Sequence, residues 1–102
     1  MASFFSKLFG TPTDYLKLVN EGAQIIDVRT KQEFQGGHIR VSKNIPLNEL
    51  ASGCSKLDKT KPVITCCASG MRSASAKSIL KSKGFEAYNG GGWMSLQGKI
   101  KK

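Results

Sequence analysis

The fold of this 102-residue chain is decided by the stretch Pro62-Val63-Ile64-Thr65-Cys66-Cys67-Ala68-Ser69-Gly70-Met71-Arg72-Ser73. Its first part is an almost unbroken apolar run, which is typical of a parallel strand that is covered on both faces. A helical pattern follows over residues 73–83, and Gly84 is its expected stop. The stretch therefore predicts a buried strand over 62–66, a tight turn and a helix.

The rest of the chain repeats this alternation of strands and helices. A second buried strand is expected at 25–29, and shorter strands are expected at 44–47 and 85–88. Residues 30–33 carry a capping-box pattern, which predicts a single helical turn after the second strand. The three glycines at 90–92 are expected to break the pattern. Strands that alternate with helices, without a repeat or a linker, indicate one three-layer α/β domain.

Length and composition fit one domain and exclude several classes of protein. A chain of this length has room for a single domain, and its 39% of apolar residues is well above the share in a disordered chain. No apolar run approaches the roughly 20 residues that a membrane-spanning helix needs. The N-terminus lacks the apolar region of a signal peptide. We therefore expect a cytoplasmic protein, with no membrane span, that works as a monomer.

The net charge of +9 is spread unevenly along the chain. Residues 61–102 carry eight basic residues against Glu86 alone, so the excess lies around and after the cysteine pair. Such a field would attract small anions or an acidic protein partner. Nucleic acid is not an expected partner, because no aromatic stacking pattern or groove-reading helix accompanies the charge.

The three cysteines, Cys54, Cys66 and Cys67, do not form a disulfide framework. Their number is odd, and a bridge between adjacent cysteines would be strained. The chain has no CxxC motif and a single histidine, His38, so no metal site is expected. No organic cofactor is expected either. Cys54 lies in a polar loop and is expected to be an incidental surface thiol.

The turn after the strand at 62–66 is the expected site of chemistry. In an open parallel sheet, ligands bind beyond the carboxyl ends of the strands. A strand-to-helix turn there aims backbone N–H groups and the positive end of the helix into one concavity. A cysteine at the start of the turn would have its pKa lowered from about 8.5 to roughly 3.5–7.5. Such a cysteine is a candidate nucleophile that needs no separate base.

Short blocks that follow one another along residues 12–97 share the pattern of a known family. The blocks are Asp27-Val28-Arg29, Glu33-Phe34, Gly37-His38-Ile39, Asn44-Ile45-Pro46-Leu47, the cysteine loop, Gly84-Phe85 and Gly91-Gly92-Trp93. Together they resemble the single-domain rhodaneses, which are thiosulfate or persulfide sulfurtransferases. The resemblance implies a three-layer α/β/α domain whose parallel sheet has about five strands. It also implies a cysteine that takes a sulfane sulfur from a small anionic donor, as a persulfide, and passes it to a thiol acceptor.

The domain organisation follows from the same comparison. Residues 11–98 are expected to form the rhodanese-like domain, after a short amphipathic segment at 1–10 and before a basic tail at 99–102. The family's first edge strand has no clear counterpart before Thr11. Arg40-Val41 replaces the usual proline and glycine, and the second tryptophan common near the end is absent. These departures affect the edges of the domain and leave the cysteine loop intact.

The cysteine doublet allows two interpretations of the loop. Counted from Cys67, the loop has six residues and resembles that of the sulfurtransferases. Counted from Cys66, it has seven residues and satisfies the signature of cysteine phosphatases and arsenate reductases. The match at Cys67, the threonine at position 65 in place of the usual histidine, and the apolar run that ends at Cys66 all favour Cys67. A non-catalytic module that binds an anion or a protein is a third possibility.

The resemblance assigns the site residues one by one. Cys67 is the expected catalytic residue, and the expected substrate-binding residues are Ala68, Ser69, Gly70, Met71 and Arg72. Lys61 and Lys77 are expected to assist Arg72 in binding an anion. Structural roles are expected for Asp27, Arg29, His38 and Trp93.

Overall fold

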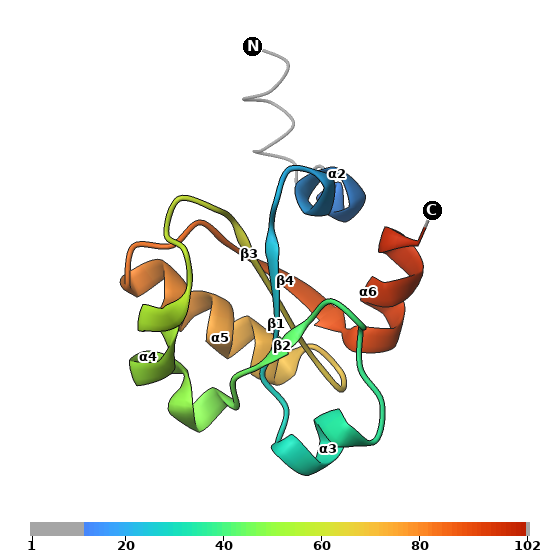
Figure 1. Cartoon of the computed structure of the whole chain (residues 1–102), viewed down its shortest axis with the longest axis horizontal. Coiled ribbons are helices and arrows are strands. Elements are labelled where there is room, and N and C mark those ends of the chain that lie inside the picture. Colours follow the sequence, from blue (N-terminus) through green and yellow to red (C-terminus); the bar gives the residue numbers. More distant parts are fainter. Residues whose placement is uncertain (1–11, 102) are drawn as a thin grey trace.

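The computed structural model describes residues 12–101, and a parallel sheet lies at its centre (Figure 1). The strands are β1 (Gln24–Asp27), β2 (Lys43–Asn44), β3 (Val63–Cys67) and β4 (Ala87–Gly92). Their order is β2-β1-β3-β4, and every neighbouring pair is parallel. The predicted α/β class is confirmed, with four strands in the described part of the chain where about five were expected. The amphipathic segment predicted at 1–10 lies outside the described residues.

Helices cover both faces of the sheet. They are α2 (Tyr15–Asn20), α3 (Lys31–Gln35), α4 (Leu50–Gly53), α5 (Met71–Ser82) and α6 (Trp93–Ile100), with short 3₁₀ helices η1 (Leu47–Glu49) and η2 (Cys54–Lys56) beside α4. Helices α4 and α5 bury one apolar cluster, and α2 and α6 bury a second cluster on the opposite face. Within residues 12–101, no helix is long and apolar enough to cross a membrane.

Strand β4 differs from its prediction. We expected a strand at 85–88 that ends before the glycines, but β4 runs through all three of them. A Cβ atom on Gly90 would lie 2.7 Å from the carbonyl oxygen of Thr65, so glycine permits this close approach to β3. Gly91 has a φ of +81°, and the pairing register with β3 shifts there, as in a β-bulge. The glycines therefore shape the strand and do not end it.

Four other boundaries also differ. Strand β3 ends at Cys67 and not at Cys66, and α5 begins at Met71, two residues before the predicted start. Strand β2 contains only Lys43 and Asn44, whereas a strand over 44–47 was predicted. Helix α6 includes Lys99 and Ile100, which the sequence placed in the basic tail.

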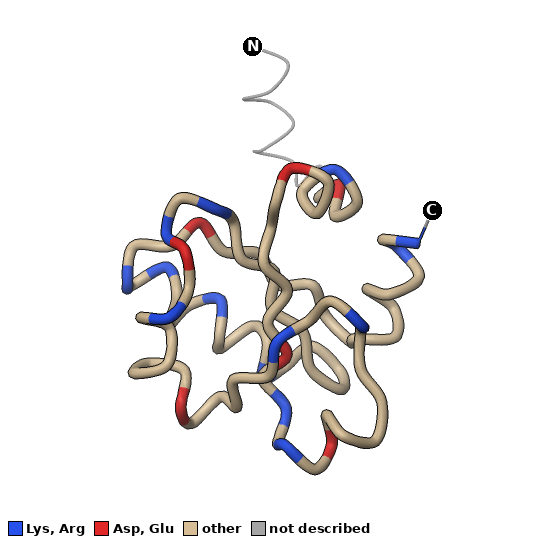
Figure 2. Tube along the Cα trace, viewed as in Figure 1, with Lys and Arg blue, Asp and Glu red and all other residues tan. Residues whose placement is uncertain are grey.

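Basic residues gather on α5 and on the segment that precedes β3 (Figure 2). This segment includes Lys61, whose side chain packs beside Gly22, just before β1. Lys61 and Gly22 lie just before the first residues of β3 and β1, at the amino end of the sheet, whereas Cys67 lies at its carboxyl end. The prediction that Lys61 helps to bind an anion at the cysteine loop is therefore wrong.

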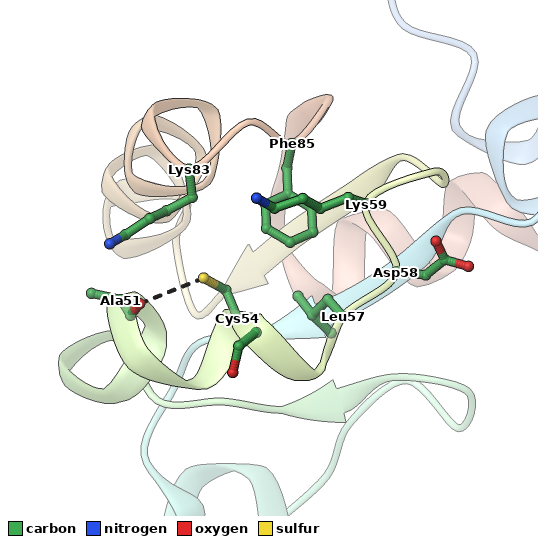
Figure 3. Close-up of a pocket in the computed structure, with 8 residues that line it drawn as sticks. Ala51, Cys54, Leu57, Asp58, Lys59, Lys83 and Phe85 are labelled. Atoms are coloured by element: carbon green, nitrogen blue, oxygen red, sulfur yellow. Dashed lines mark hydrogen bonds between the residues drawn. The ribbon is translucent and has the colours of Figure 1, made fainter.

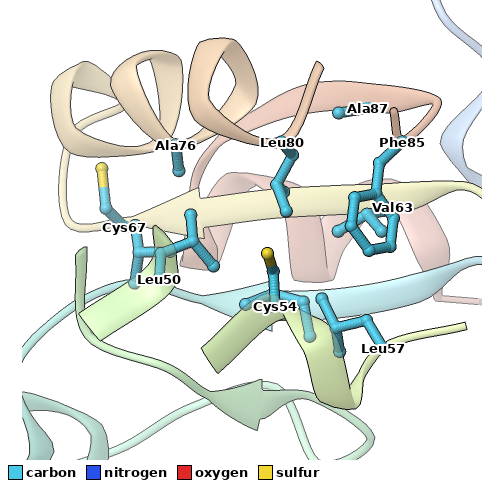
Figure 4. Packing of buried hydrophobic residues seen from close by; sticks show 11 residues of the cluster. Leu50, Cys54, Leu57, Val63, Cys67, Ala76, Leu80, Phe85 and Ala87 are labelled. Carbon is cyan, nitrogen blue, oxygen red and sulfur yellow. The ribbon is translucent and has the colours of Figure 1, made fainter. Parts of the chain in front are cut away.

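Cys54 belongs to the core, so its assignment as a surface thiol is wrong. Its side chain is 4% exposed, and its Sγ donates a hydrogen bond to the carbonyl oxygen of Ala51 at 3.5 Å (Figure 3). Because the segment 50–57 is largely helical, Leu50, Cys54 and Leu57 share one side, and that side faces the sheet (Figure 4). A cavity of about 580 Å³ lies beside Cys54, and Cys67 does not line it.

Candidate active site

A three-residue turn connects β3 to α5, at the place that the sequence predicted. Its last residue, Gly70, has a φ of +105°, a conformation that strains any residue with a side chain. A Cβ atom at this position would also lie 3.4 Å from the Cα atom of Gly91. The turn therefore packs tightly against the bulge of β4, and it folds the start of α5 back over the end of β3.

The sulfur of Cys67 lies inside this turn and accepts hydrogen bonds from the backbone. The N–H group of Gly70 is 3.0 Å from the sulfur, and that of Ser73 is 3.3 Å away. The hydroxyl oxygen of Ser73 lies 3.5 Å from the same sulfur. The N-terminus of the twelve-residue helix α5 adds its positive dipole end. Together these groups form a concavity that favours a negatively charged sulfur.

The pKa of Cys67 is lowered from its ordinary value. Burial of the sulfur is the largest influence and acts to raise the pKa. The hydroxyl of Ser73 and the backbone N–H groups of Ser73, Gly70 and Ser69 act against it and together outweigh it. Cys67 therefore ionises more readily than a cysteine in water.

Cys66 faces the other side of the sheet. It packs in the second apolar cluster, among Ile25, Ile64 and Leu96, and it is fully buried. Burial, and after it the carboxylate of Asp27, raise the pKa of this thiol to about 12. Cys66 is therefore a neutral thiol at physiological pH. The seven-residue loop would need the sulfur of Cys66 to face the turn, and it does not.

Arg72 closes the turn by binding Glu33. Its Nη1 and Nη2 atoms donate to the two carboxylate oxygens of Glu33, at 2.7 and 3.0 Å. The same carboxylate completes the predicted capping box by accepting from the backbone N–H of Thr30 at 3.0 Å. Arg72 first, and Thr30 after it, lower the pKa of Glu33 to about 2. The ion pair therefore links the cysteine turn to α3.

The predicted substrate-binding residues contribute in different ways. Ser69 and Gly70 direct N–H groups to the sulfur, whereas the guanidinium of Arg72 is bound to Glu33. Ala68, in the turn, and Met71, the first residue of α5, are exposed, and Met71 is 80% exposed. A mostly apolar groove of about 310 Å³ lies next to Arg72, and its other lining residues are Val28, Thr30, Pro46, Leu47 and Asn48.

The residues expected to serve structure do so. Arg29 binds the fully buried carboxylate of Asp27 at 2.7 Å and also donates to the carbonyl oxygen of Gly37. Its guanidinium lies over the ring of Trp93, 4.9 Å from the ring centre. The Nδ1 atom of His38 lies 2.7 Å from the carbonyl oxygen of Phe34. These contacts hold the ends of β1, α3 and α6 together beside the site.

Sequence reasoning missed two polar side chains of the site. The hydroxyl of Ser73 contacts the sulfur of Cys67 and also donates to Oδ1 of Asn89 at 2.6 Å. Ser73 could have been predicted, because it lies in the first turn of the helix after the loop, and that helical turn must face the end of β3. The contact of Asn89 could not have been predicted, because it depends on the bulge of β4, and no sequence pattern indicates that bulge.

The chain is similar in sequence to a known family and to known proteins. A family model described as "Rhodanese-like domain" matches residues 11–99. The chain is 34% identical over 86 residues to the thiosulfate sulfurtransferase GlpE of Pseudomonas savastanoi, covering 83% of this chain and 81% of the relative. It is 43% identical over 81 residues to the uncharacterized protein YqhL of Bacillus subtilis, covering 78% of this chain. The match spans 64% of the length of YqhL.

Solved structures share the fold. A rhodanese with anions from E. coli superposes with a TM-score of 0.68 at 32% identity. The match covers 72% of this chain and 91% of that structure. It therefore includes most of both chains.

Proposed function

This chain belongs to the rhodanese-like domain family, and we propose that it is a sulfurtransferase that carries a sulfane sulfur on Cys67. One observation carries the proposal: backbone N–H groups and the hydroxyl of Ser73 converge on the Cys67 sulfur. Within residues 12–101, no backbone N–H group donates to the sulfur of the adjacent Cys66, and the pKa of Cys66 is raised. A sulfur held in the way that Cys67 is ionises more readily, and the thiolate is the nucleophilic form of cysteine.

The first half-reaction loads the cysteine. The thiolate of Cys67 attacks the outer sulfur of thiosulfate, the sulfur–sulfur bond of thiosulfate breaks, and sulfite leaves with the electron pair. Cys67 then carries a persulfide whose outer sulfur is negatively charged. The N–H groups of the turn are preorganised to stabilise charge at this position.

The second half-reaction unloads the cysteine. A thiolate, or cyanide in vitro, attacks the outer sulfur of the persulfide. The bond to Cys67 breaks, and Cys67 leaves as the thiolate that began the cycle. We propose that the acceptor enters past the exposed side chains of Ala68 and Met71, beside the groove next to Arg72. In this scheme, Arg72 acts through Glu33 to hold the turn in place.

Steady-state kinetics test the proposed function. Thiocyanate formation from thiosulfate and cyanide is expected to follow ping-pong kinetics, because the two substrates react in separate steps. Cys67→Ser is expected to abolish turnover, and Cys66→Ser is expected to retain most of it. Hydrolysis of an aryl phosphate that depends on Cys66, without thiocyanate formation, would instead identify a phosphatase. Anion binding without turnover would indicate a binding module.

A further inference from the structure

We propose that Asn89 is a positioning residue that controls the reactivity of Cys67 by holding the hydroxyl proton of Ser73. The two residues come from different elements, Asn89 from β4 and Ser73 from α5. Asn89 does not contact the Cys67 sulfur. Its effect would pass through the single hydroxyl group that lies between them.

The orientation of the Asn89 amide is fixed by its neighbours. The backbone N–H of Gly91 donates to Oδ1 at 2.9 Å, and Nδ2 donates to the carbonyl oxygen of Gly70 at 3.4 Å. A flipped amide would place two donors together at Gly91 and two acceptors together at Gly70. Oδ1 therefore faces Ser73, at 2.6 Å.

Ser73 has one hydroxyl proton and three neighbours that could accept it. They are Oδ1 of Asn89 at 2.6 Å, the carbonyl oxygen of Gly70 at 3.1 Å and the sulfur of Cys67 at 3.5 Å. Because Oδ1 can only accept, the shortest of these contacts requires the proton of Ser73. The hydroxyl oxygen then presents a lone pair to Cys67, which suits a thiol that donates its own proton.

Ionisation of Cys67 reverses this requirement. The thiol proton passes to solvent, and the resulting thiolate needs a donor where Ser73 presents a lone pair. The hydroxyl of Ser73 must then turn from Asn89 to the sulfur. Asn89 and the thiolate therefore compete for one proton, and the strength of the contact to Asn89 sets how easily Cys67 ionises.

The charged groups near Cys67 are bound to one another in ion pairs. The competition between Asn89 and the thiolate for the Ser73 proton therefore controls the ionisation of Cys67. Asp27 binds Arg29 at the end of β1, and Glu33 of α3 binds Arg72 of α5. Cys66, a further titratable neighbour, is a neutral thiol behind the sheet. The neutral donors around the Cys67 sulfur therefore decide its ionisation. Among these donors, the hydroxyl of Ser73 can rotate, whereas the backbone N–H groups are fixed.

Substituting Asn89 tests the proposal directly on the thiol. Asn89→Leu removes the competing acceptor, and the thiolate fraction of Cys67 at a pH below its pKa is expected to rise about 2–10-fold, which is the worth of one neutral hydrogen bond. The measurement is the pH dependence of iodoacetamide alkylation, with the label on Cys67 located by peptide mass spectrometry. Asn20→Leu, an exposed position at the end of α2, is the matched control and is expected to leave the titration unchanged.

Two further variants separate this role from a general structural one. Asn89→Asp keeps an acceptor and strengthens it, so the thiolate fraction is expected to fall. Because the added charge also disfavours the thiolate, this variant is compared with and without the hydroxyl of Ser73, and the fall is expected to be smaller in a Ser73→Ala background. In a Ser73→Ala background, Asn89→Leu is expected to have no further effect on the titration. The inference concerns the cysteine of the proposed function, but alkylation does not require sulfur transfer, so the two can fail separately.

The proposal is overturned by any of three results. The first is a titration of Asn89→Leu that is unchanged or shifted to higher pH. The second is a titration of Asn89→Asp that is shifted to lower pH. The third is an Asn89→Leu effect that persists at full size without the hydroxyl of Ser73.

Discussion

Arg72 and Glu33 are 39 positions apart in the chain, yet two hydrogen bonds of 2.7 and 3.0 Å join their side chains. The pair fixes the cysteine turn to α3, the helix that follows the neighbouring strand β1. Both bonds join the guanidinium of Arg72 to the carboxylate of Glu33, so the guanidinium is held in place and ties the turn to α3. We call this ion pair the clamp. This relationship gives Arg72 a function that does not require it to touch the substrate.

The clamp predicts how stability depends on pH. The pKa of Glu33 falls from 4.5 to about 2 on folding, so its contribution to stability is complete above pH 4.5 and is lost as the pH falls towards 2. Glu33→Gln is therefore expected to lower the urea midpoint at pH 7 and to lose less stability than the wild type on acidification. Glu49→Gln is the control, because Glu49 is exposed and forms no ion pair within residues 12–101. Equal acid sensitivity of Glu33→Gln and the wild type would contradict the clamp.

The clamp also predicts the kinetics of Arg72 variants. Arg72→Ala is expected to lower kcat/KM for thiosulfate roughly 10–1000-fold, since the turn loses its tie to α3 and the anion loses a nearby charge. If Arg72 acts mainly by positioning the turn, Glu33→Gln also lowers kcat/KM for thiosulfate. The double variant is then expected to be little worse than Arg72→Ala alone. A wild-type kcat/KM for Arg72→Ala would show that the guanidinium neither holds the turn nor assists the anion.

Gly90 in β4 and Gly98 in α6 predict opposite changes in stability. A Cβ atom on Gly90 would lie 2.8 Å or less from side-chain and backbone atoms of Ile64, Thr65 and Leu96. Gly90→Ala is therefore expected to cost about 1–3 kcal/mol, measured by urea unfolding. A Cβ atom on Gly98 in α6 would have no neighbour within 4 Å among residues 12–101, so Gly98→Ala is expected to stabilise the protein by about 0.5–1 kcal/mol. A neutral Gly90→Ala would mean that β4 lies farther from β3 than described.

The two faces of β3 predict different thiol reactivities. Iodoacetamide at pH 7 is expected to label Cys67 first, and thiosulfate is expected to protect it. Cys66 is expected to react only when the protein unfolds, because its pKa is raised to about 12, whereas the pKa of Cys67 is lowered. Cys66→Ser is expected to cost about 1–2 kcal/mol, as a buried hydroxyl without a partner does. Early labelling of Cys66 would contradict the assignment of the faces.

Much of this architecture was predictable because it follows local patterns. The apolar runs of β1 and β3 and the capping box at Thr30 each lie within a few residues of sequence. The alternation of side chains along β3 places Cys66 and Cys67 on opposite faces of the sheet.

The features that sequence reasoning missed depend on contacts between distant segments. The glycines of β4 appeared to be a break because the close approach of β3 is not visible in the sequence. Cys54 appeared exposed because its neighbours are polar, although the helical turns at 50–57 direct it inward. The partners of Arg72 and Ser73 are 39 and 16 positions away, and no local pattern pairs them.

The central claim is that Cys67 carries the transferred sulfur, and mass spectrometry tests it most directly. The protein is incubated with thiosulfate, digested without reductant, and its cysteine-containing peptides are weighed. Sulfur transfer through Cys67 predicts a gain of one sulfur atom on Cys67, its removal by cyanide, its absence in Cys67→Ser and its persistence in Cys66→Ser. A sulfur atom on Cys66, or no gain at all from thiosulfate or from a persulfide donor, would show that Cys67 does not carry the sulfur.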